Sequence, residues 1–125
     1  DIMENPSDQK LWEMYKKAKI YWHAAGFGED LEKHPEKAEH FGIATAEAMG
    51  AGAVPGVISA GGLKEIVEDG INGFLWNTTD ELIQKTMLLI NHQKILRKMS
   101  DAGRERAKIF SIDMFYKEIE KVVTR

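Results

Sequence analysis

The chain lacks several features that would each point to a particular class of protein. Its 125 residues contain no cysteine, which excludes a disulfide framework and a thiolate metal site and is compatible with a reducing cytoplasm. No uninterrupted apolar run is long enough to span a bilayer, and no signal-peptide pattern opens the chain. The 17 basic and 20 acidic residues give a net charge of −3, which argues against a general nucleic-acid binder. We therefore expect a cytoplasmic protein with no nucleic-acid partner.

What is present predicts one α/β domain over residues 1–125. Hydrophobic residues make up 43% of the chain, enough for a core at this length. Apolar spacing, capping residues and turn residues predict alternating helices and strands, and such alternation is typical of a parallel, doubly wound, Rossmann-like sheet. The expected helices cover 9–18, 43–49 and 63–69, then two segments after a capping box at Thr78 and Glu81 and a last one from Ser111; the expected strands cover 20–22, 54–59 and 74–76.

Three finer expectations concern burial and helix ends. The strand Ile20-Tyr21-Trp22 shows no polar alternation, which predicts burial on both faces. The helix at 63–69 is expected to end at Gly70. The helix after Thr78 is expected to turn five residues inward, namely Leu82, Ile83, Thr86, Met87 and Ile90.

The most informative stretch is 39–62, which reads as a polar loop, an alanine-rich helix, a strand and a glycine loop. Gly42 stands at the helix start, where Ser, Thr, Asp or Asn would normally supply a capping oxygen. The backbone NH groups of Ile43, Ala44 and Thr45 are therefore expected to be open donors at the positive end of a helix. Such groups bind anions, and phosphates above all.

Two glutamates flank this helix start. Glu39 lies in the preceding loop, and Glu47 lies one turn inside the helix, about 6 Å further along its axis. Each has an ordinary alternative use, because Glu39 can cap its own helix and Glu47 can simply be solvated.

These residues together resemble the signature of family 4 glycosyltransferases, which are retaining enzymes of the GT-B fold. The resemblance rests on Glu39 and Glu47 separated by seven residues, on Phe41-Gly42 between them, and on Gly61-Gly62 followed by Glu65-Ile66-Val67. It runs from about Leu11 to Phe110 and falls in the C-terminal, nucleotide-sugar-binding lobe. The earlier strands of that lobe and the whole acceptor-binding lobe have no counterpart here. The resemblance thus implies a fragment of a larger enzyme, with a missing N-terminal lobe as its partner.

The resemblance also implies roles for individual residues. Glu39 would be catalytic and would hold the donor sugar, and Glu47 would accept hydrogen bonds from ribose hydroxyls. The cleft would be bordered by His23, although a histidine at a strand end is more often structural, and by the loop 24–37. The implied substrates are a nucleotide-diphosphate sugar and a glycan or lipid-linked acceptor, with no cofactor and no metal. The other donor-binding residues would be His40, Phe41, Gly42, Ile43, Ala44, Thr45, Gly61 and Gly62.

Other readings of the chain stay open. It could be a non-catalytic nucleotide-binding or structural module, or another GT-B enzyme such as a sugar-nucleotide epimerase or a phosphorylase; the Glu39-to-Glu47 spacing favours a glycosyltransferase over the latter two. The late helix is basic, which would suit peripheral contact with the cytoplasmic face of a membrane but is more often just a solvated face. Its basic residues are Lys94, Arg97, Lys98, Arg104, Arg106 and Lys108.

Overall fold

A parallel sheet of three strands forms the centre of the computed structural model, which describes residues 7–37, 42–110 and 120. The strands are β1 (Ile20–His23), β2 (Val54–Ile58) and β3 (Phe74–Trp76), in the spatial order β1-β2-β3. In register, Ile20 pairs with Val54 and Gly56 pairs with Phe74. The predicted α/β fold with a parallel, Rossmann-like sheet is confirmed.

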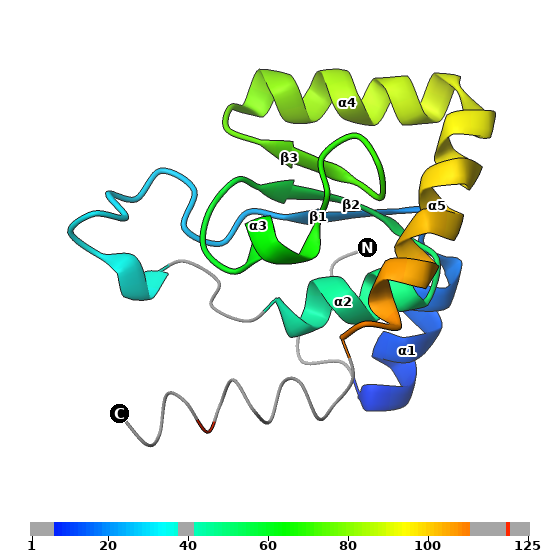
Figure 1. Cartoon of the computed structure of the whole chain (residues 1–125), viewed down its shortest axis with the longest axis horizontal. Coiled ribbons are helices and arrows are strands. Elements are labelled where there is room, and N and C mark those ends of the chain that lie inside the picture. Colours follow the sequence, from blue (N-terminus) through cyan, green and yellow to red (C-terminus); the bar gives the residue numbers. More distant parts are fainter. Residues whose placement is uncertain (1–6, 38–41, 111–119, 121–125) are drawn as a thin grey trace.

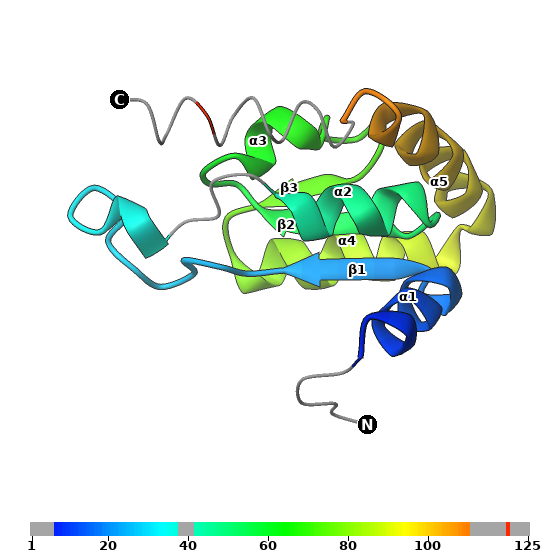
Figure 2. The same cartoon turned by 90° about the horizontal axis from the view of Figure 1, so that it is seen from below.

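Helices cover both faces of this sheet. α4 (Thr79–Asn91) lies on one face, whereas α2 (Ile43–Gly50) and the short α3 (Leu63–Ile66) lie on the other (Figure 1). α5 (Gln93–Ala107) crosses one end of the sheet and packs on α2, and α1 (Asp8–Lys17) lies at the same end. Seen from below, α2 runs along the strands (Figure 2). A single turn of 3-10 helix, η1 (Pro35–Lys37), interrupts the loop after β1.

Two helices begin with side-chain caps, and the cap of α4 belongs to the predicted capping box at Thr78 and Glu81. The Ser7 hydroxyl accepts a hydrogen bond from the Lys10 NH group at the start of α1. The Thr78 hydroxyl accepts one from the Glu81 NH group at the start of α4, and the Glu81 carboxylate accepts one in return from the Asn77 NH group. Satisfied donors of this kind fix where each helix starts.

The core consists of one cluster in which the sheet packs on α2 and α3 and a second in which it packs on α4 and α5. Its largest member, Trp76, is 2% exposed, and its indole Nε1 donates a hydrogen bond of 3.1 Å to the Gly56 carbonyl oxygen. Met49 and Leu63 pack in the same cluster from α2 and α3. From α5, Leu96, Met99 and Gly103 are buried. The helix predicted from Ser111 lies outside the described residues.

β2 is the central strand, yet Pro55 is its second residue. The Val54 NH group bonds to the Lys19 carbonyl on the β1 side, so the position of Pro55 faces the β3 side. There β3 pairs only from Gly56 onward, so a proline without an NH group breaks no ladder bond. Gly73 fits against this proline because a Cβ atom there would stand 2.6 Å from the Pro55 carbonyl oxygen.

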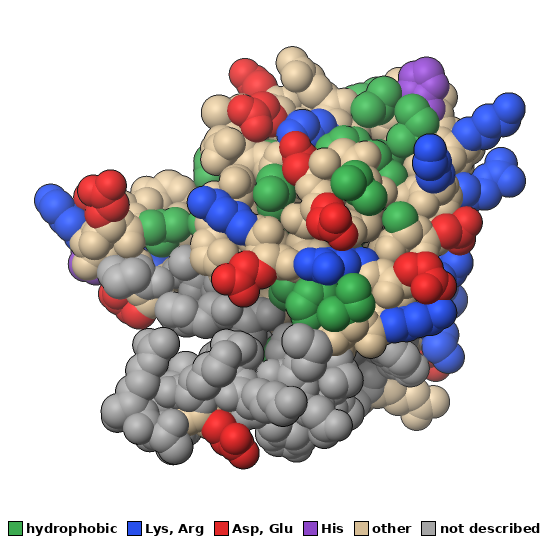
Figure 3. All heavy atoms as spheres, in the orientation of Figure 1, with side chains coloured by type: hydrophobic (Ala, Val, Ile, Leu, Met, Phe, Trp, Pro, Cys, Tyr) green, Lys and Arg blue, Asp and Glu red, His purple; other side chains and the backbone are tan. Residues whose placement is uncertain are grey.

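The predicted inward face of α4 is wrong for three of its five residues. Ile83 is 53% exposed, Met87 48% and Ile90 51%, whereas Leu89 is 1% exposed. Hydrophobic side chains accordingly lie on the surface along α4 (Figure 3). The helix is rotated because the Lys85 ammonium group reaches inward and donates a hydrogen bond of 2.7 Å to the Leu75 carbonyl oxygen. Leu82 and Thr86 are half-buried, as predicted.

The burial expected for β1 is also wrong. No residue of β1 is buried, and Trp22 is 58% exposed. The physical reason is position, because β1 has a neighbouring strand on one side only in the described chain. The Trp22 indole Nε1 instead donates a hydrogen bond of 3.1 Å to the Thr86 hydroxyl of α4.

α3 ends at Ile66, three residues earlier than predicted. Val67 is extended and buried, and its NH group makes the last bond of the helix, to the Leu63 carbonyl. The carbonyls of Glu65 and Ile66 are taken by the Arg106 guanidinium from α5. A side chain from a distant helix therefore ends α3, well before Gly70.

Within the part of the chain that the structure describes, no helix is both long and apolar enough to cross a membrane.

Candidate functional site

The carboxyl ends of the three strands define the edge at which a ligand is expected. Because all strands run in parallel, His23, Ile58 and Trp76 end at the same side of the sheet. Loop 24–37 and the start of α2 lie at this edge, on the left of Figure 1, as does the turn at Gly61-Gly62. Ligands of open parallel sheets bind outside this edge, so the structure brings together the segments that the sequence assigned to one site.

Loop 24–37 is held to the sheet by two apolar side chains. Phe27 packs on Trp76 with ring centroids 5.4 Å apart, and Leu31 packs on the core as a half-buried residue. Within the loop, the Asp30 carboxylate accepts hydrogen bonds from the NH groups of Glu32 and Lys33. The loop therefore has a defined shape beside the ligand edge. Phe27 was not singled out in the sequence, although an aromatic residue between two glycines in a polar loop is a recognisable signal.

Gly42 is the N-cap residue of α2, as predicted, and the position requires glycine for two reasons. Its φ of +65° lies in the left-handed region, which disfavours residues with a Cβ atom. A Cβ atom there would also collide with the end of the Ile66 side chain and would stand 3.3 Å from Leu63 Cδ2. The chain can therefore enter α2 close against α3 only with glycine at this point.

The start of α2 carries no side-chain cap, as predicted. The first backbone bond of the helix runs from the Ala46 NH group to the Gly42 carbonyl at 2.9 Å. The NH groups of Ile43, Ala44 and Thr45 precede it and have no acceptor among the described residues. No acidic residue occupies the first turn, so the positive end of the helix is not neutralised from within it.

The side chains of this first turn differ in what they can reach. Ile43 is 38% exposed and lies at the surface, and Ala44 is half-buried. Thr45 is 0% exposed, and its Oγ1 atom has no hydrogen-bond partner among the described residues. Ile43 and Ala44 therefore have surface that a ligand at this edge can reach, whereas Thr45 has none.

Glu47 lies exposed on α2, one turn after the helix start. Its carboxylate forms no hydrogen bond or ion pair with any described residue. Two carboxylate oxygens offer about four acceptor positions, which is the chemistry needed to hold the hydroxyl groups of a sugar.

Gly61 and Gly62 form the turn between β2 and α3. Gly61 is exposed with a φ of +58°, and Gly62 is the N-cap residue of α3. Two backbone hydrogen bonds fix the residues that precede this turn. The Ser59 NH group bonds to the Trp76 carbonyl at 2.8 Å, and the Ala60 NH group bonds to the Ile58 carbonyl at 2.9 Å. A main chain without side chains is thereby presented at the edge, where a ligand can approach closely.

The remaining predicted site residues fall into two groups. His23 ends β1 and is half-buried, with its Nδ1 atom 3.1 Å from the Tyr21 hydroxyl, so this nitrogen is engaged within the fold. Glu39, His40 and Phe41 lie outside the described residues, and their predicted roles stay predictions. In residues 7–37, 42–110 and 120, no cluster of three or more His, Asp or Glu could hold a metal ion.

The fold is an α/β domain with a parallel, Rossmann-like sheet whose carboxyl edge is the expected ligand edge. The chain belongs to the family described as glycosyl transferases group 1, whose model matches residues 2–106. It is 33% identical over 90 residues to an uncharacterized glycosyltransferase of Methanocaldococcus jannaschii, a match that covers 70% of this chain and 26% of the relative. It is also 31% identical over 70 residues to a trehalose synthase of Pyrococcus horikoshii, covering 56% and 17% of the two chains.

Solved structures confirm the predicted C-terminal lobe of a GT-B fold. The C-terminal domain of a glycosyl transferase group 1 family protein from Francisella tularensis matches with a TM-score of 0.70 and 22% identity, over 86% of this chain and 51% of that one. Anabaena HepE, solved in complex with UDP and glucose, matches with a TM-score of 0.58 and 27% identity, over 69% of this chain and 24% of that one. The chain thus spans about half of the first domain and about a quarter of the first sequence relative.

Proposed function

We propose that this chain supplies part of the donor site of a retaining, family 4 glycosyltransferase. The enzyme would transfer a hexosyl group from a nucleotide-diphosphate sugar to a glycan or lipid-linked acceptor. The observation that carries the proposal is the uncapped start of α2 at Gly42, placed at the carboxyl edge of a parallel sheet. Support comes from HepE, a similar protein whose structures contain UDP and UDP-glucose.

The proposed chemistry follows from where charge develops. When the glycosidic bond to the diphosphate breaks, negative charge builds on the phosphate oxygens. Preorganised donors aimed at those oxygens stabilise the transition state more than the ground state. The NH groups of Ile43, Ala44 and Thr45 are such donors, and they act without a metal ion or cofactor in this proposal.

The two glutamates have different roles in this proposal. Glu47 accepts hydrogen bonds from the ribose hydroxyls, so it contributes mainly to nucleotide affinity. Glu39 and the backbone of Phe41, Gly42 and Ile43 hold the donor sugar, so Glu39 contributes mainly to turnover. The glycine turn at Gly61-Gly62 lets the donor approach the main chain.

Completion of the site requires more than these 125 residues in our proposal. The acceptor and the rest of the donor would be bound by further strands and by an N-terminal lobe. Support for this comes from the share of its relatives that the chain covers, which is 26% for the Methanocaldococcus protein and 17% for the trehalose synthase. Sugar transfer therefore has to be measured with a protein that contains both lobes.

The test is calorimetric titration, with UDP-, GDP- and ADP-glucose, of a protein that contains this chain together with the rest of both lobes. We expect one of them to bind, and Glu47→Ala to weaken that binding at least tenfold, because hydrogen bonds to a charged group contribute about 1.5–3 kcal/mol. Glu13→Ala is the matched control, since Glu13 is an exposed glutamate on α1, at the opposite end of the sheet. If no sugar nucleotide binds, or if Glu47→Ala changes nothing, the donor site is assigned wrongly.

A second measurement separates an enzyme from a binding module. In a protein with both lobes, Glu39→Gln should reduce sugar transfer far more than it reduces nucleotide affinity. Binding without any transfer would favour a non-catalytic nucleotide-binding module instead.

A further inference from the structure

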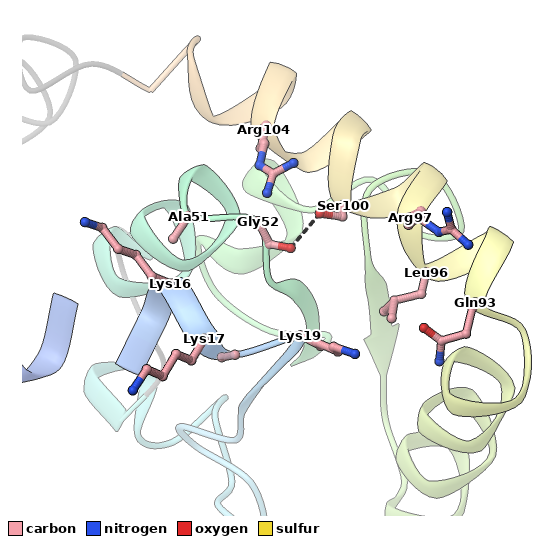
Figure 4. A pocket seen from close by; sticks show the side chains of 11 residues that line it. Lys16, Lys17, Lys19, Ala51, Gly52, Gln93, Leu96, Arg97, Ser100 and Arg104 are labelled. Atoms are coloured by element: carbon pink, nitrogen blue, oxygen red, sulfur yellow. Dashed lines mark hydrogen bonds between the residues drawn. The ribbon is translucent and has the colours of Figure 1, made fainter. Parts of the chain in front are cut away.

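A cavity lies at the amino ends of the strands, at the end of the sheet opposite the proposed donor site. Its volume is about 470 Å³, within the range that holds a small ligand. It is formed by the end of α1, the first residue before β1, the turn between α2 and β2, and one face of α5 (Figure 4). We refer to it as the amino-edge pocket.

The amino-edge pocket is strongly cationic in a chain whose net charge is −3. Five of its eleven lining residues are lysine or arginine and none is acidic. Figure 3 shows Lys and Arg side chains gathered at this end of the molecule. The five cations come from α1, α5 and the residue before β1; they are Lys16, Lys17, Lys19, Arg97 and Arg104.

These charges are not neutralised within the described part of the chain. Only Arg104 has an acidic partner there, Asp101, at 3.5 Å. The two side chains are 53% and 78% exposed, and an ion pair so open to water contributes little. Lys19 and Arg97 have no ion pair with any described carboxylate.

Helix electrostatics explain some of these cations but not all. Lys16 and Lys17 occupy the last turn of α1, where a cation is favourable, and Arg104 does the same for α5. Arg97, by contrast, lies near the start of α5, whose first turn has no acidic residue and no side-chain cap. Neither a helix C-terminus nor an acidic residue in the first turn of α5 therefore accounts for Arg97.

The wall of the pocket is fixed in place. The Ser100 hydroxyl donates a hydrogen bond of 2.6 Å to the Gly52 carbonyl oxygen, which ties α5 to the turn before β2. Gly52 has a φ of +101°, and a Cβ atom there would collide with the Arg104 guanidinium, so that guanidinium packs directly on the turn. Figure 4 shows Arg104 beside Gly52 and Lys19 extending toward α5. The basic groups thus surround a preformed cavity with Leu96, which is 7% exposed, in its lining.

We propose that the amino-edge pocket binds a phosphate-bearing ligand through Lys19, Arg97 and Arg104. A ligand with at least two negative charges matches this group of cations, and the volume leaves room for a body of sugar size beside the phosphate. Lys16 and Lys17 are exposed and can turn toward a bound anion from the α1 wall. The phosphate belongs either to a soluble phosphoester or diphosphate or to a phospholipid headgroup. This site is separate from the proposed donor site and does not depend on it.

The experiment compares two double variants of the chain that remove the same charge. Lys19→Gln with Arg97→Gln changes the pocket, whereas Lys94→Gln with Lys98→Gln changes exposed lysines of α5 that do not line it. Each protein is titrated with sodium pyrophosphate, and separately mixed with phosphatidylglycerol vesicles and with phosphatidylcholine vesicles. Circular dichroism checks that each variant is folded.

We expect the pocket variant to lose about 25-fold in affinity, because each basic residue near an anionic phosphate surface contributes about fivefold. The control variant should lose no more than about twofold, by long-range charge alone. If this pattern occurs with pyrophosphate, the ligand is soluble; if it occurs only with phosphatidylglycerol vesicles, the ligand is a headgroup. If neither probe binds, or if both variants lose affinity equally, the proposal is overturned.

Discussion

We expect Arg106 to stabilise this domain strongly, although the sequence around it is a run of basic residues that is typical of a solvated helix face. Its Nε atom donates a hydrogen bond of 3.1 Å to the Ile66 carbonyl, and its Nη2 atom donates one of 2.7 Å to the Glu65 carbonyl. Its Nε atom also lies 3.5 Å from a Glu68 carboxylate oxygen. The guanidinium therefore fills the role of a C-cap for α3 from a different helix.

The magnitude follows from these contacts. Each hydrogen bond from a charged donor contributes about 1.5–3 kcal/mol when buried, and the side chain of Arg106 is 24% exposed. The half-exposed pair with Glu68 adds less than about 1 kcal/mol. Discounting for solvent, we expect Arg106→Gln to lower the free energy of unfolding by about 2–3 kcal/mol.

The assay is urea unfolding monitored by circular dichroism. Lys108→Gln is the matched control, because it removes one positive charge at the residue that follows α5. The only described ion pair of Lys108, with Glu105, is exposed to solvent. That substitution should change the free energy of unfolding by less than about 0.5 kcal/mol. Equal effects of the two substitutions on the free energy of unfolding would refute the capping role of Arg106 and would indicate an ordinary solvated helix residue.

Two further substitutions test the start of α2. Gly42→Ala should lower the free energy of unfolding by about 1–2 kcal/mol, because alanine is strained at a φ of +65° and displaces the Ile66 side chain; an unchanged urea midpoint would contradict the left-handed conformation. Thr45→Val should raise the free energy of unfolding by about 0.5–1 kcal/mol, because it replaces a fully buried hydroxyl that has no described partner with a methyl group of similar size. A loss of stability in the Thr45→Val protein, measured by the same unfolding curve, would mean that the hydroxyl is hydrogen-bonded.

Much of the fold could be predicted because its signals are local. A capping hydroxyl at Ser7 or Thr78 fixes a helix start within three residues of sequence, and the glycine at position 42 marks a start without a cap. The three strands and their parallel order follow from short apolar runs that alternate with helices. The candidate site could be predicted for the same reason, since its glycines and Glu47 all lie between positions 42 and 62 of the sequence.

Two of the three errors arise where a residue distant in sequence determines the structure, and the third, the burial of β1, arises because β1 has a neighbouring strand on one side only in the described chain. The end of α3 is set by Arg106, which lies 40 residues beyond Ile66 in sequence. The rotation of α4 depends on a hydrogen bond from Lys85 to the Leu75 carbonyl of β3. The spacing of apolar residues along α4 does not predict such a bond. The amino-edge pocket belongs to the same class, because its lysines and arginines come from segments about 80 residues apart and form no motif.

The unpaired edge of β1 is the position at which a further strand could join the described sheet. β1 is an edge strand in the described chain, and Trp22 stands largely uncovered on it. A strand joining there in the direction of its neighbours would bring its own terminal turn alongside loop 24–37. Extension of the sheet beside β1 would therefore lengthen the edge at which we propose that the sugar nucleotide binds, without covering it.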